Sequence, residues 1–200
     1  MNDENKNTTS KTSKKYIKIS EYVKNYLDEN YVDVLYKLDY NSNYDINNSN
    51  LTKLDDNHTI ITLRFKNISR ALLQEIVRHD HLLSPTIKST RYTLKELKNE
   101  NKFKLSKFTK EDLDKISKYI VLTGNNKVDL NNIKILNIIR DDLLQNISND
   151  ISKYNLSEAY KTEGVFTLPL SNIKNIIKLR TSKDALWEFQ RLANELKTLI

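Results

Sequence analysis

Seven side chains suited to binding phosphate or moving a proton fall within one stretch of fifteen residues. They are Arg78, His79, His81, Ser84, Ser89, Arg91 and Tyr92. The planar guanidinium of arginine matches two phosphate oxygens at once, and serine and tyrosine hydroxyls add further donors. This combination predicts a site for a phosphate monoester or a nucleotide. A second interpretation is equally open, because a polar, proline-bearing loop followed by an exposed lysine-rich helix contains many of the same residues.

The residues of this stretch give little support for other kinds of site. In an extended chain His79 and His81 share one face, but they supply only two ligands and the sequence has no second cluster, so we predict no metal site. No G-x-S-x-G motif surrounds Ser84 or Ser89, which argues against a serine hydrolase. The chain has no cysteine, so thiolate metal sites and cysteine nucleophiles are excluded. Neither of its two glycines lies in a glycine-rich phosphate loop, so side chains and helix ends would have to hold a nucleotide.

The composition describes a mildly basic chain. Its 200 residues, 38% of them apolar, suit a single domain over 16–200, and the polar residues 1–15 are predicted to be disordered. Residues 1–20 supply +3 of the formal charge of +7 through five lysines and two acidic residues. Positive charge favours anionic partners, but the remaining +4 is small, so we rank nucleic-acid binding through the lysine-rich tail last. No secretory signal or membrane-length apolar run is present, which predicts a cytoplasmic protein without membrane contact.

Apolar periodicity and capping residues predict the elements that position the stretch. Residues 58–65 and 161–168 read as strands. Ser69 is an expected N-cap for a helix over 70–78, which leads directly into the stretch. Further helices are predicted over 17–38 (one or two), 109–124, 128–147, 171–180 and 183–200, with a loop at 41–50. Together they predict an α+β fold with a small central sheet flanked by long helices and a helical C-terminal half.

The order of residues in the stretch resembles the signature of the flavin-dependent thymidylate synthases, R-H-R-x-x-S-x-N-x-x-S-x-R-Y. The matching residues are Arg78, His79, Ser84, Ser89, Arg91 and Tyr92. The run SPTIKSTRYTLKELKNE is similar to the version found in the epsilon-proteobacterial branch of that family. Further blocks fit in the same order at 68–79, 157–163 and 179–189. The resemblance therefore runs from about residue 58 to residue 196 and leaves the first 50 residues unmatched.

The resemblance implies a homotetramer with active sites shared between subunits. In that family reduced FAD takes the methylene group of methylenetetrahydrofolate, passes it to C5 of dUMP and supplies the hydride that completes the methyl group, while NADPH reduces the flavin. No cysteine attacks the pyrimidine, so the cysteine-free composition is compatible with this chemistry.

The family's substrate residues carry over position by position. Ser89 and Arg91 match the serine and arginine that bind dUMP, and Tyr92 matches the aromatic residue near the folate and flavin. Lys153 replaces a phosphate-binding arginine, and a lysine can serve there as a point charge. Arg180 matches the arginine placed against the pyrimidine. The resemblance thus implies Ser89, Tyr92 and Arg180 as catalytic residues.

The cofactor side matches less well. Arg78 is implied to serve both dUMP and FAD, and His79 and Asn175 are implied to serve FAD. Asp80 takes the place of the signature's third residue, normally arginine, and His81 is expected to approach that place. Other replaced family residues are Thr52, Asn57, Pro169, Leu170 and Ser171. The alternative is therefore a catalytically degenerate homologue that binds dUMP or serves as a non-catalytic subunit.

Overall fold

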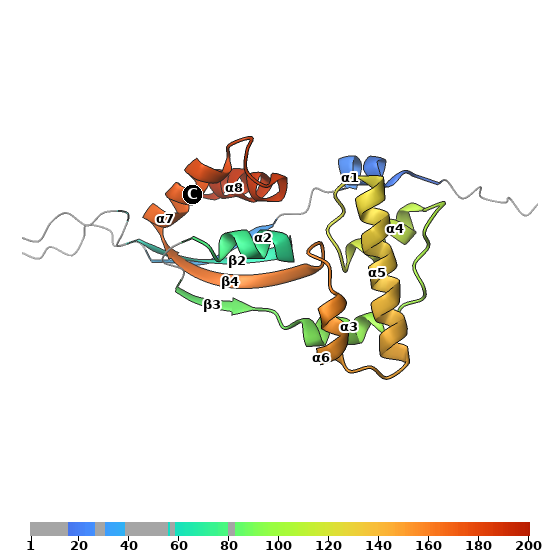
Figure 1. The fold of residues 1–200 in the computed structure, drawn as a ribbon. Helices are drawn as coiled ribbons and strands as arrows, with labels where there is room; N and C mark the ends of the chain where they lie inside the picture. Colours follow the sequence, from blue (N-terminus) through green and yellow to red (C-terminus); the bar gives the residue numbers. More distant parts are fainter. Residues whose placement is uncertain (1–15, 27–30, 39–55, 57–58, 80–82) are drawn as a thin grey trace, which may run out of the picture.

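The computed structural model describes residues 16–26, 31–38, 56, 59–79 and 83–200. The tail at 1–15, the loop predicted at 41–50, and the positions Thr52, Asn57, Asp80 and His81 lie outside the described residues. Within the described part, the chain combines a four-stranded sheet with helices, which confirms the α+β class (Figure 1). Among the described helices, none combines the length and apolar character that a bilayer span requires.

The sheet is antiparallel throughout. Its strands are β1 (Val32–Leu38), β2 (Ile60–Ser69), β3 (Leu83–Ile87) and β4 (Lys161–Pro169), in the order β1-β2-β4-β3. Buried and partly exposed residues alternate along β4, and along β2 as far as Phe65, so one face of the sheet packs against a core. Leu63 and Phe166 are register partners on that face and both are fully buried.

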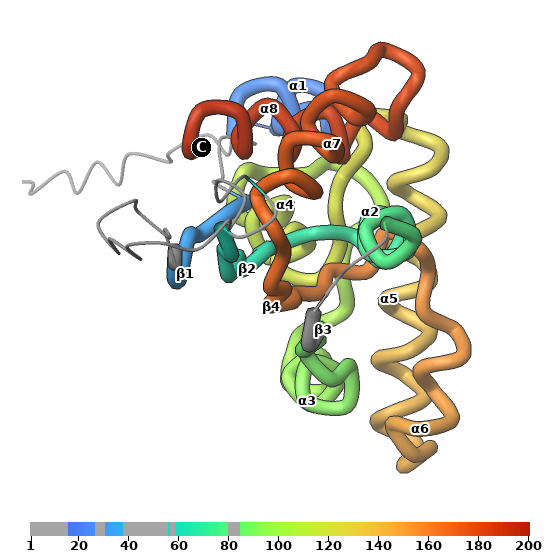
Figure 2. The backbone as a smooth tube through the Cα atoms, turned by 90° about the vertical axis from the view of Figure 1, so that its left-hand side faces the viewer, coloured from blue at the N-terminus to red at the C-terminus, as the bar shows by residue number. Residues whose placement is uncertain are grey.

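The helices form two groups. The buried face of the sheet is covered by α2 (Arg70–Ile76), α7 (Leu170–Arg180) and α8 (Trp187–Leu199) (Figure 1). The other group makes a helical lobe beside the sheet, also visible in the turned view of Figure 2. It contains α1 (Ile19–Tyr26), α3 (Thr90–Leu97), α4 (Lys110–Ser117), α5 (Asn126–Leu144), α6 (Asn149–Ser152) and the 3-10 turn η1 (Lys153–Asn155).

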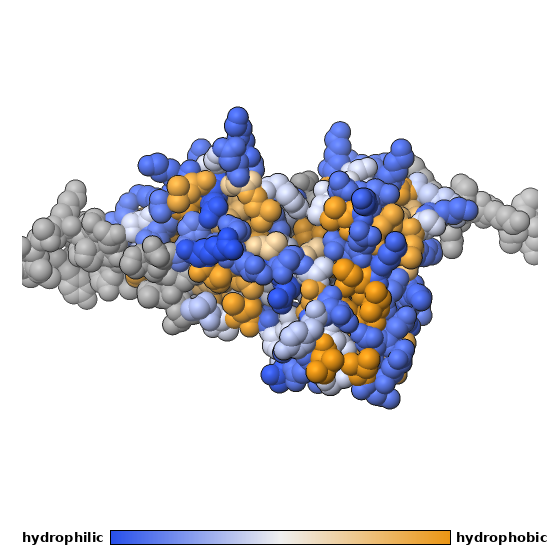
Figure 3. Space-filling model, in the orientation of Figure 1, coloured by the Kyte–Doolittle hydropathy of each residue, from blue (hydrophilic) through white to orange (hydrophobic). Residues whose placement is uncertain are grey.

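Each group has its own hydrophobic core. The sheet core gathers β2 and β4 residues with Leu72, Ile173 and Phe189 of the covering helices. The core of the helical lobe gathers Leu113 and Ile133 with residues of α1 and α3. Backbone hydrogen bonds join the two lobes, from Val121 N to the Ala159 carbonyl at 2.8 Å and from Lys161 N to the Tyr119 carbonyl at 2.7 Å. Figure 3 shows a mainly hydrophilic surface interrupted by apolar patches over both lobes.

Several predicted elements are confirmed. Ser69 caps α2, because its Oγ accepts a hydrogen bond from Leu72 N at 2.9 Å. The strand predicted at 161–168 is β4, and the helices predicted at 128–147 and 171–180 are α5 and α7 with small shifts at their ends. The helix predicted at 183–200 begins later, at Trp187.

Three local predictions are wrong. Residues 32–38 form strand β1 rather than a helix. The Glu195 carboxylate of α8 accepts hydrogen bonds from Tyr31 N at 2.8 Å and Val32 N at 2.9 Å, and these bonds place the residues that follow beside β2. The helix predicted at 109–124 ends at Ser117, since Ile120 instead pairs with Tyr160 in an isolated bridge. The middle of the polar stretch, Leu83–Ile87, is strand β3 rather than a loop.

Gly164 leaves room for the ring of Phe166, which lies two residues further along the same strand. A Cβ at this position would lie 2.6 Å from Cε2 and 2.9 Å from Cζ of Phe166. That ring is fully buried and packs on Phe65 with 5.4 Å between ring centroids. We expect Gly164→Ala to lower the free energy of unfolding by about 1–3 kcal/mol in urea denaturation, because overpacking forces the ring to move. Phe166→Leu removes the ring edge and should make the alanine less costly in the double variant; an equal cost in both backgrounds would contradict the steric explanation.

Candidate functional site

The end of α2 and the end of α7 bring one set of predicted residues together. We call it the α2–α7 cluster: Glu75, Arg78, His79, Arg180 and Phe189. The Arg180 Nε donates a hydrogen bond to His79 Nε2 at 3.1 Å, a bond that requires this imidazole nitrogen to be unprotonated. The guanidinium of Arg180 also lies 3.5 Å from a Glu75 carboxylate oxygen and 4.9 Å from the Phe189 ring centroid. Arg78 pairs with the same glutamate at 2.7 Å and extends a largely exposed side chain from the turn after α2.

A second set lies where α3 meets α6. This α3–α6 cluster consists of Ser89, Arg91, Tyr92, Asp150 and Lys153. Asp150 Oδ1 forms ion pairs with both cations, at 3.2 Å from Arg91 Nε and 3.3 Å from Lys153 Nζ, and accepts a hydrogen bond from Lys153. The Arg91 side chain is 65% exposed, so these are surface pairs that contribute little to stability. Ser89 occupies the N-cap position of α3 without using its side chain as a cap, and Tyr92 is exposed.

The two clusters lie at different ends of the chain's fold. Figures 1 and 2 show α3 and α6 at one end of the molecule and α7 and α8 at the other. The family resemblance implies one nucleotide site that combines Arg78–Tyr92 with Lys153 and Arg180. In a single chain these residues instead lie in the two separate clusters, each of which is one half-set of the implied site. Each half-set carries a pair of cations, one at Arg78 and Arg180 and the other at Arg91 and Lys153.

Comparison with known proteins decides the family. The model of the thymidylate synthase complementing protein family matches residues 56–200. The chain belongs to the flavin-dependent thymidylate synthase family. The flavin-dependent thymidylate synthase of Campylobacter jejuni strain RM1221 is 50% identical over 139 residues, and that of Wolinella succinogenes is 44% identical over the same length. These alignments cover 70% of this chain but only 64% and 65% of the two relatives, so the chain spans less than two thirds of their length.

The likeness extends to three-dimensional structure. A crystal structure of ThyX from Helicobacter pylori with FAD and dUMP superposes with a TM-score of 0.65 at 33% sequence identity. The match covers 72% of this chain and 68% of the crystallised chain. The predicted family resemblance, including its epsilon-proteobacterial character, is therefore confirmed, and the fold is that of the flavin-dependent thymidylate synthases.

The junction of β4 and α7 holds three of the replaced family residues, Pro169, Leu170 and Ser171. Pro169 has no backbone N–H, and those of Leu170 and Ser171 donate to the Thr59 carbonyl at 2.8 Å and to the Asp56 carbonyl at 3.2 Å. These three positions therefore leave no backbone N–H for a cofactor. Asn175 lies exposed further along α7. A cofactor with a pyrophosphate would meet the exposed Arg78 guanidinium, which fits that charge.

Sequence reasoning missed three residues of the two clusters. Asp150 lies three residues before Lys153, and that spacing is a signal for an ion pair on one helical face. Glu75 lies three residues before Arg78 and pairs with both Arg78 and Arg180. Phe189 reads as an ordinary core residue, and only the fold shows that its ring meets His79 and Arg180.

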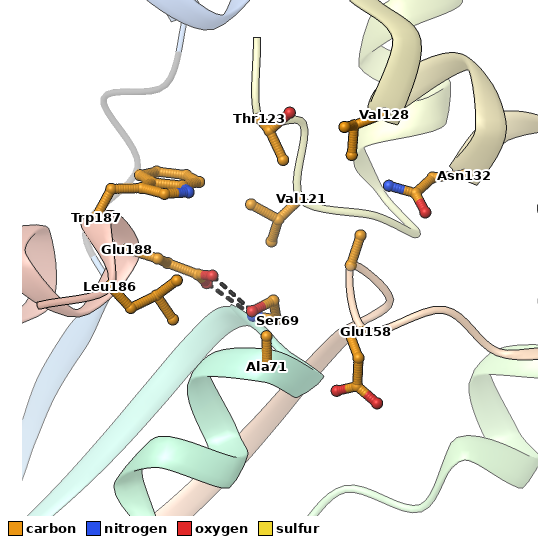
Figure 4. A pocket seen from close by; sticks show the side chains of 11 residues that line it. Ser69, Ala71, Val121, Thr123, Val128, Asn132, Glu158, Leu186, Trp187 and Glu188 are labelled. Atoms are coloured by element: carbon orange, nitrogen blue, oxygen red, sulfur yellow. Dashed lines mark hydrogen bonds between the residues drawn. The ribbon is translucent and has the colours of Figure 1, made fainter. Parts of the chain in front are cut away.

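A cavity of about 260 Å³ lies elsewhere, between the two lobes (Figure 4). Its walls include Val121, Val128 and Trp187, and it contains none of the predicted site residues. Trp187 lines this opening and is 36% exposed. Within the described residues there is no group of three potential metal ligands.

Proposed function

We propose that this chain is a flavin-dependent thymidylate synthase that converts dUMP to dTMP with methylenetetrahydrofolate, FAD and NADPH. The observation that carries the proposal is Asp150, a single carboxylate shared by two exposed cations. A phosphate dianion offers the same kind of partner with more charge, and it can accept from Arg91 and Lys153 together. Family membership and the dUMP bound by the Helicobacter relative support that ligand.

Residues of the α3–α6 cluster are proposed to bind the nucleotide. Arg91 and Lys153 hold the 5′-phosphate, with the Ser89 hydroxyl as a third donor. The N-terminus of α3 begins directly after Ser89, and its positive dipole end favours an anion there. Tyr92, exposed one turn away, presents an aromatic face to the folate and flavin.

Residues of the α2–α7 cluster are proposed to act on the base and the cofactor. Arg180 donates to the pyrimidine carbonyls and polarises them, because its guanidinium is permanently charged and largely shielded from solvent. Arg78 serves the dUMP and the FAD, while His79, Asn175 and His81 contact the FAD. The bound flavin supplies the redox chemistry of the reaction, after reduction by NADPH. Without a cysteine nucleophile, activation of the pyrimidine rests on such electrostatic contacts.

We also propose a homotetramer with active sites shared between subunits. One chain keeps its two half-sets apart, and pairing the α2–α7 cluster of one subunit with the α3–α6 cluster of another would complete each site. Exposed apolar side chains on the helical lobe, Ile138, Leu144 and Ile151, supply surface that association would cover. Light scattering of the purified protein tests the assembly, and a monomer at micromolar concentration would contradict it.

Absorbance spectroscopy tests the function directly. Purified protein with added FAD is expected to retain a flavin spectrum after desalting. It should oxidise NADPH in a dUMP-dependent manner and form dTMP when methylenetetrahydrofolate is present. A colourless protein that does not retain added FAD would overturn the enzymatic proposal.

A second candidate is a catalytically degenerate homologue that binds dUMP as a non-catalytic subunit. The observation that favours it is that the backbone N–H groups of Leu170 and Ser171 are already hydrogen bonded and so are not available to a cofactor. Calorimetric titration with dUMP separates the two candidates. Heat of binding without flavin retention supports the second, and turnover with flavin excludes it.

Asp150 competes with the phosphate in this proposal, which gives a prediction about affinity. Asp150→Asn is expected to tighten dUMP binding about two- to fivefold, because exposed ion pairs of this kind contribute a few tenths to about 1 kcal/mol. Isothermal calorimetry at low ionic strength measures the change. Asp142→Asn is the control, since Asp142 hydrogen bonds Asn155 instead. Weaker binding after Asp150→Asn would show that the carboxylate positions the cations rather than competing for them.

A further inference from the structure

The first turn of α8 contacts both ends of α2. Helix α2 has only seven residues, so its two ends lie about 10 Å apart at 1.5 Å per residue. Its first residue follows Ser69, and the turn after its last residue carries Arg78 and His79. Consecutive residues on a helix point about 100° apart, so Glu188 and Phe189 can reach different targets from one turn.

Glu188 holds the start of α2. Its side chain is 2% exposed, and its carboxylate accepts hydrogen bonds from Ser69 N at 2.7 Å and from Ser69 Oγ at 2.5 Å (Figure 4). Ser69 Oγ in turn accepts from Leu72 N, so the carboxylate, the cap and the helix form one chain of hydrogen bonds. Burial raises the pKa of Glu188, while the bonds from Ser69 and the charges of Lys161 and Arg191 act in the opposite direction.

Phe189 touches the functional pair at the other end of α2. The ring is fully buried, lies edge to face with His79 at 5.6 Å between centroids, and has the Arg180 guanidinium carbon 4.9 Å from its centroid. A guanidinium over an aromatic face is attracted to the ring, more strongly where water is excluded. The neighbouring Glu188 hydrogen bonds tie the turn that carries this ring to the start of α2.

Two other groups contact the same guanidinium through different nitrogens. The Arg180 Nε donates to His79 Nε2 at 3.1 Å, and a terminal nitrogen lies 3.5 Å from the Glu75 carboxylate. That carboxylate also makes a shorter ion pair with Arg78, at 2.7 Å. The Phe189 ring adds a third contact, which restrains the Arg180 guanidinium beside His79.

We propose that Phe189, held in place by the Glu188–Ser69 bonds, is a positioning residue that keeps Arg180 available to the pyrimidine of the substrate. This inference rests on the proposed dUMP site. Phe189 should affect binding of the base and not binding of the phosphate, because the proposed phosphate ligands Arg91 and Lys153 lie in the other cluster.

The test compares two ligands, dUMP and deoxyribose 5-phosphate, which lacks the base. Phe189→Leu is expected to weaken dUMP binding about tenfold in calorimetric titration, the range of a desolvated cation–ring contact, and to leave deoxyribose 5-phosphate binding unchanged. A residue that only fills the core would instead weaken the binding of both ligands alike.

Controls separate positioning from folding. Phe166→Leu removes a ring from the same sheet core that packs on Phe65 rather than on Arg180, and it should leave the ratio of the two affinities unchanged. The sole tryptophan of the chain, Trp187, precedes Glu188 and Phe189, so an unchanged emission spectrum shows that the first turn of α8 is still in place. Phe189→Met replaces the leucine variant if the latter does not fold.

The outcomes separate a failure of the positioning role of Phe189 from a failure of the proposed dUMP function. Wild-type affinity for dUMP in Phe189→Leu, or equal losses for both ligands, overturns the positioning role while the dUMP site stands. Absence of dUMP binding by the wild-type protein overturns the proposed function and the inference with it.

Discussion

Arg91→Ala is expected to raise the Kd for dUMP about 100-fold. Hydrogen bonds to charged groups contribute roughly 1.5–3 kcal/mol, which corresponds to about 10- to 150-fold in affinity. The upper part of this range applies because Asp150 is shared between Arg91 and Lys153. Once Arg91 is gone, the carboxylate pairs with Lys153 alone and offsets the charge of the remaining cation.

Calorimetric titration with dUMP and with deoxyuridine measures this loss and locates it. Deoxyuridine has no phosphate, so its weak binding should be the same in wild type and Arg91→Ala. Lys102→Ala is the matched control, because Lys102 is an equally exposed cation on the helical lobe that pairs with Asp141. The affinity should also become less dependent on salt in Arg91→Ala. Wild-type affinity for dUMP in the Arg91 variant would remove the phosphate role from the α3–α6 cluster.

The two clusters are proposed to bind different parts of the nucleotide. Substitutions in one cluster should therefore change ligand affinities differently from substitutions in the other. Loss of a cation at the α3–α6 cluster acts on every ligand with a phosphate. Loss of order at the α2–α7 cluster acts on ligands with a base, since Arg180 is the group proposed to meet it. Affinities for fragments of the nucleotide therefore map the two clusters independently, before any turnover is measured.

Local sequence patterns predicted the elements whose causes are local. Ser69 and the apolar residues after it predicted α2, and alternation predicted β2. Strand β1 was missed because its causes are distant: Glu195 binds the backbone at Tyr31 and Val32 from more than 160 positions away along the chain. The spacing of apolar residues within 32–38 alone does not separate the two conformations.

The same distinction applies to the candidate site. Residue types within the signature predicted arginine, serine and tyrosine as ligand-binding groups from their order alone. The partners that orient them are distant in sequence, as in the hydrogen bond from Arg180 to His79, which spans 101 positions. Glu188 and Phe189 carry no signal of their role, because a glutamate and a phenylalanine in an amphipathic helix are ordinary.

The burial of Asp129 is also not evident from the sequence. It lies in the first turn of α5, where an acidic residue normally faces solvent, yet it is fully buried. Its Oδ1 accepts from Thr123 N and Thr123 Oγ, and its Oδ2 accepts from Gly124 N, all at 2.9 Å. Gly124 adopts a positive φ of 82°, so the carboxylate fixes the turn that leads into α5, at the edge of the cavity.

Asp129→Ala is expected to lower the free energy of unfolding by about 3 kcal/mol or more, because three donors lose their acceptor in a buried place. Urea denaturation followed by the emission of Trp187 measures the change. Asp129→Asn keeps one oxygen and should cost about half as much, since its amide nitrogen cannot accept from Gly124 N. The matched control is Asp142→Asn, a partly exposed position on the same helix.

The pH dependence of the Asn variant tests the charge of Asp129 itself. Burial raises its pKa above 3.8, against the opposing effect of the bonds from Thr123 and Gly124. A raised pKa means that the folded state binds the proton more tightly, so this group's contribution is full below the unfolded pKa and is lost as pH rises through the folded one. The stability advantage of wild type over Asp129→Asn should therefore shrink between acidic and neutral pH. An advantage that grows instead would show that the three hydrogen bonds outweigh burial and stabilise the ionised carboxylate.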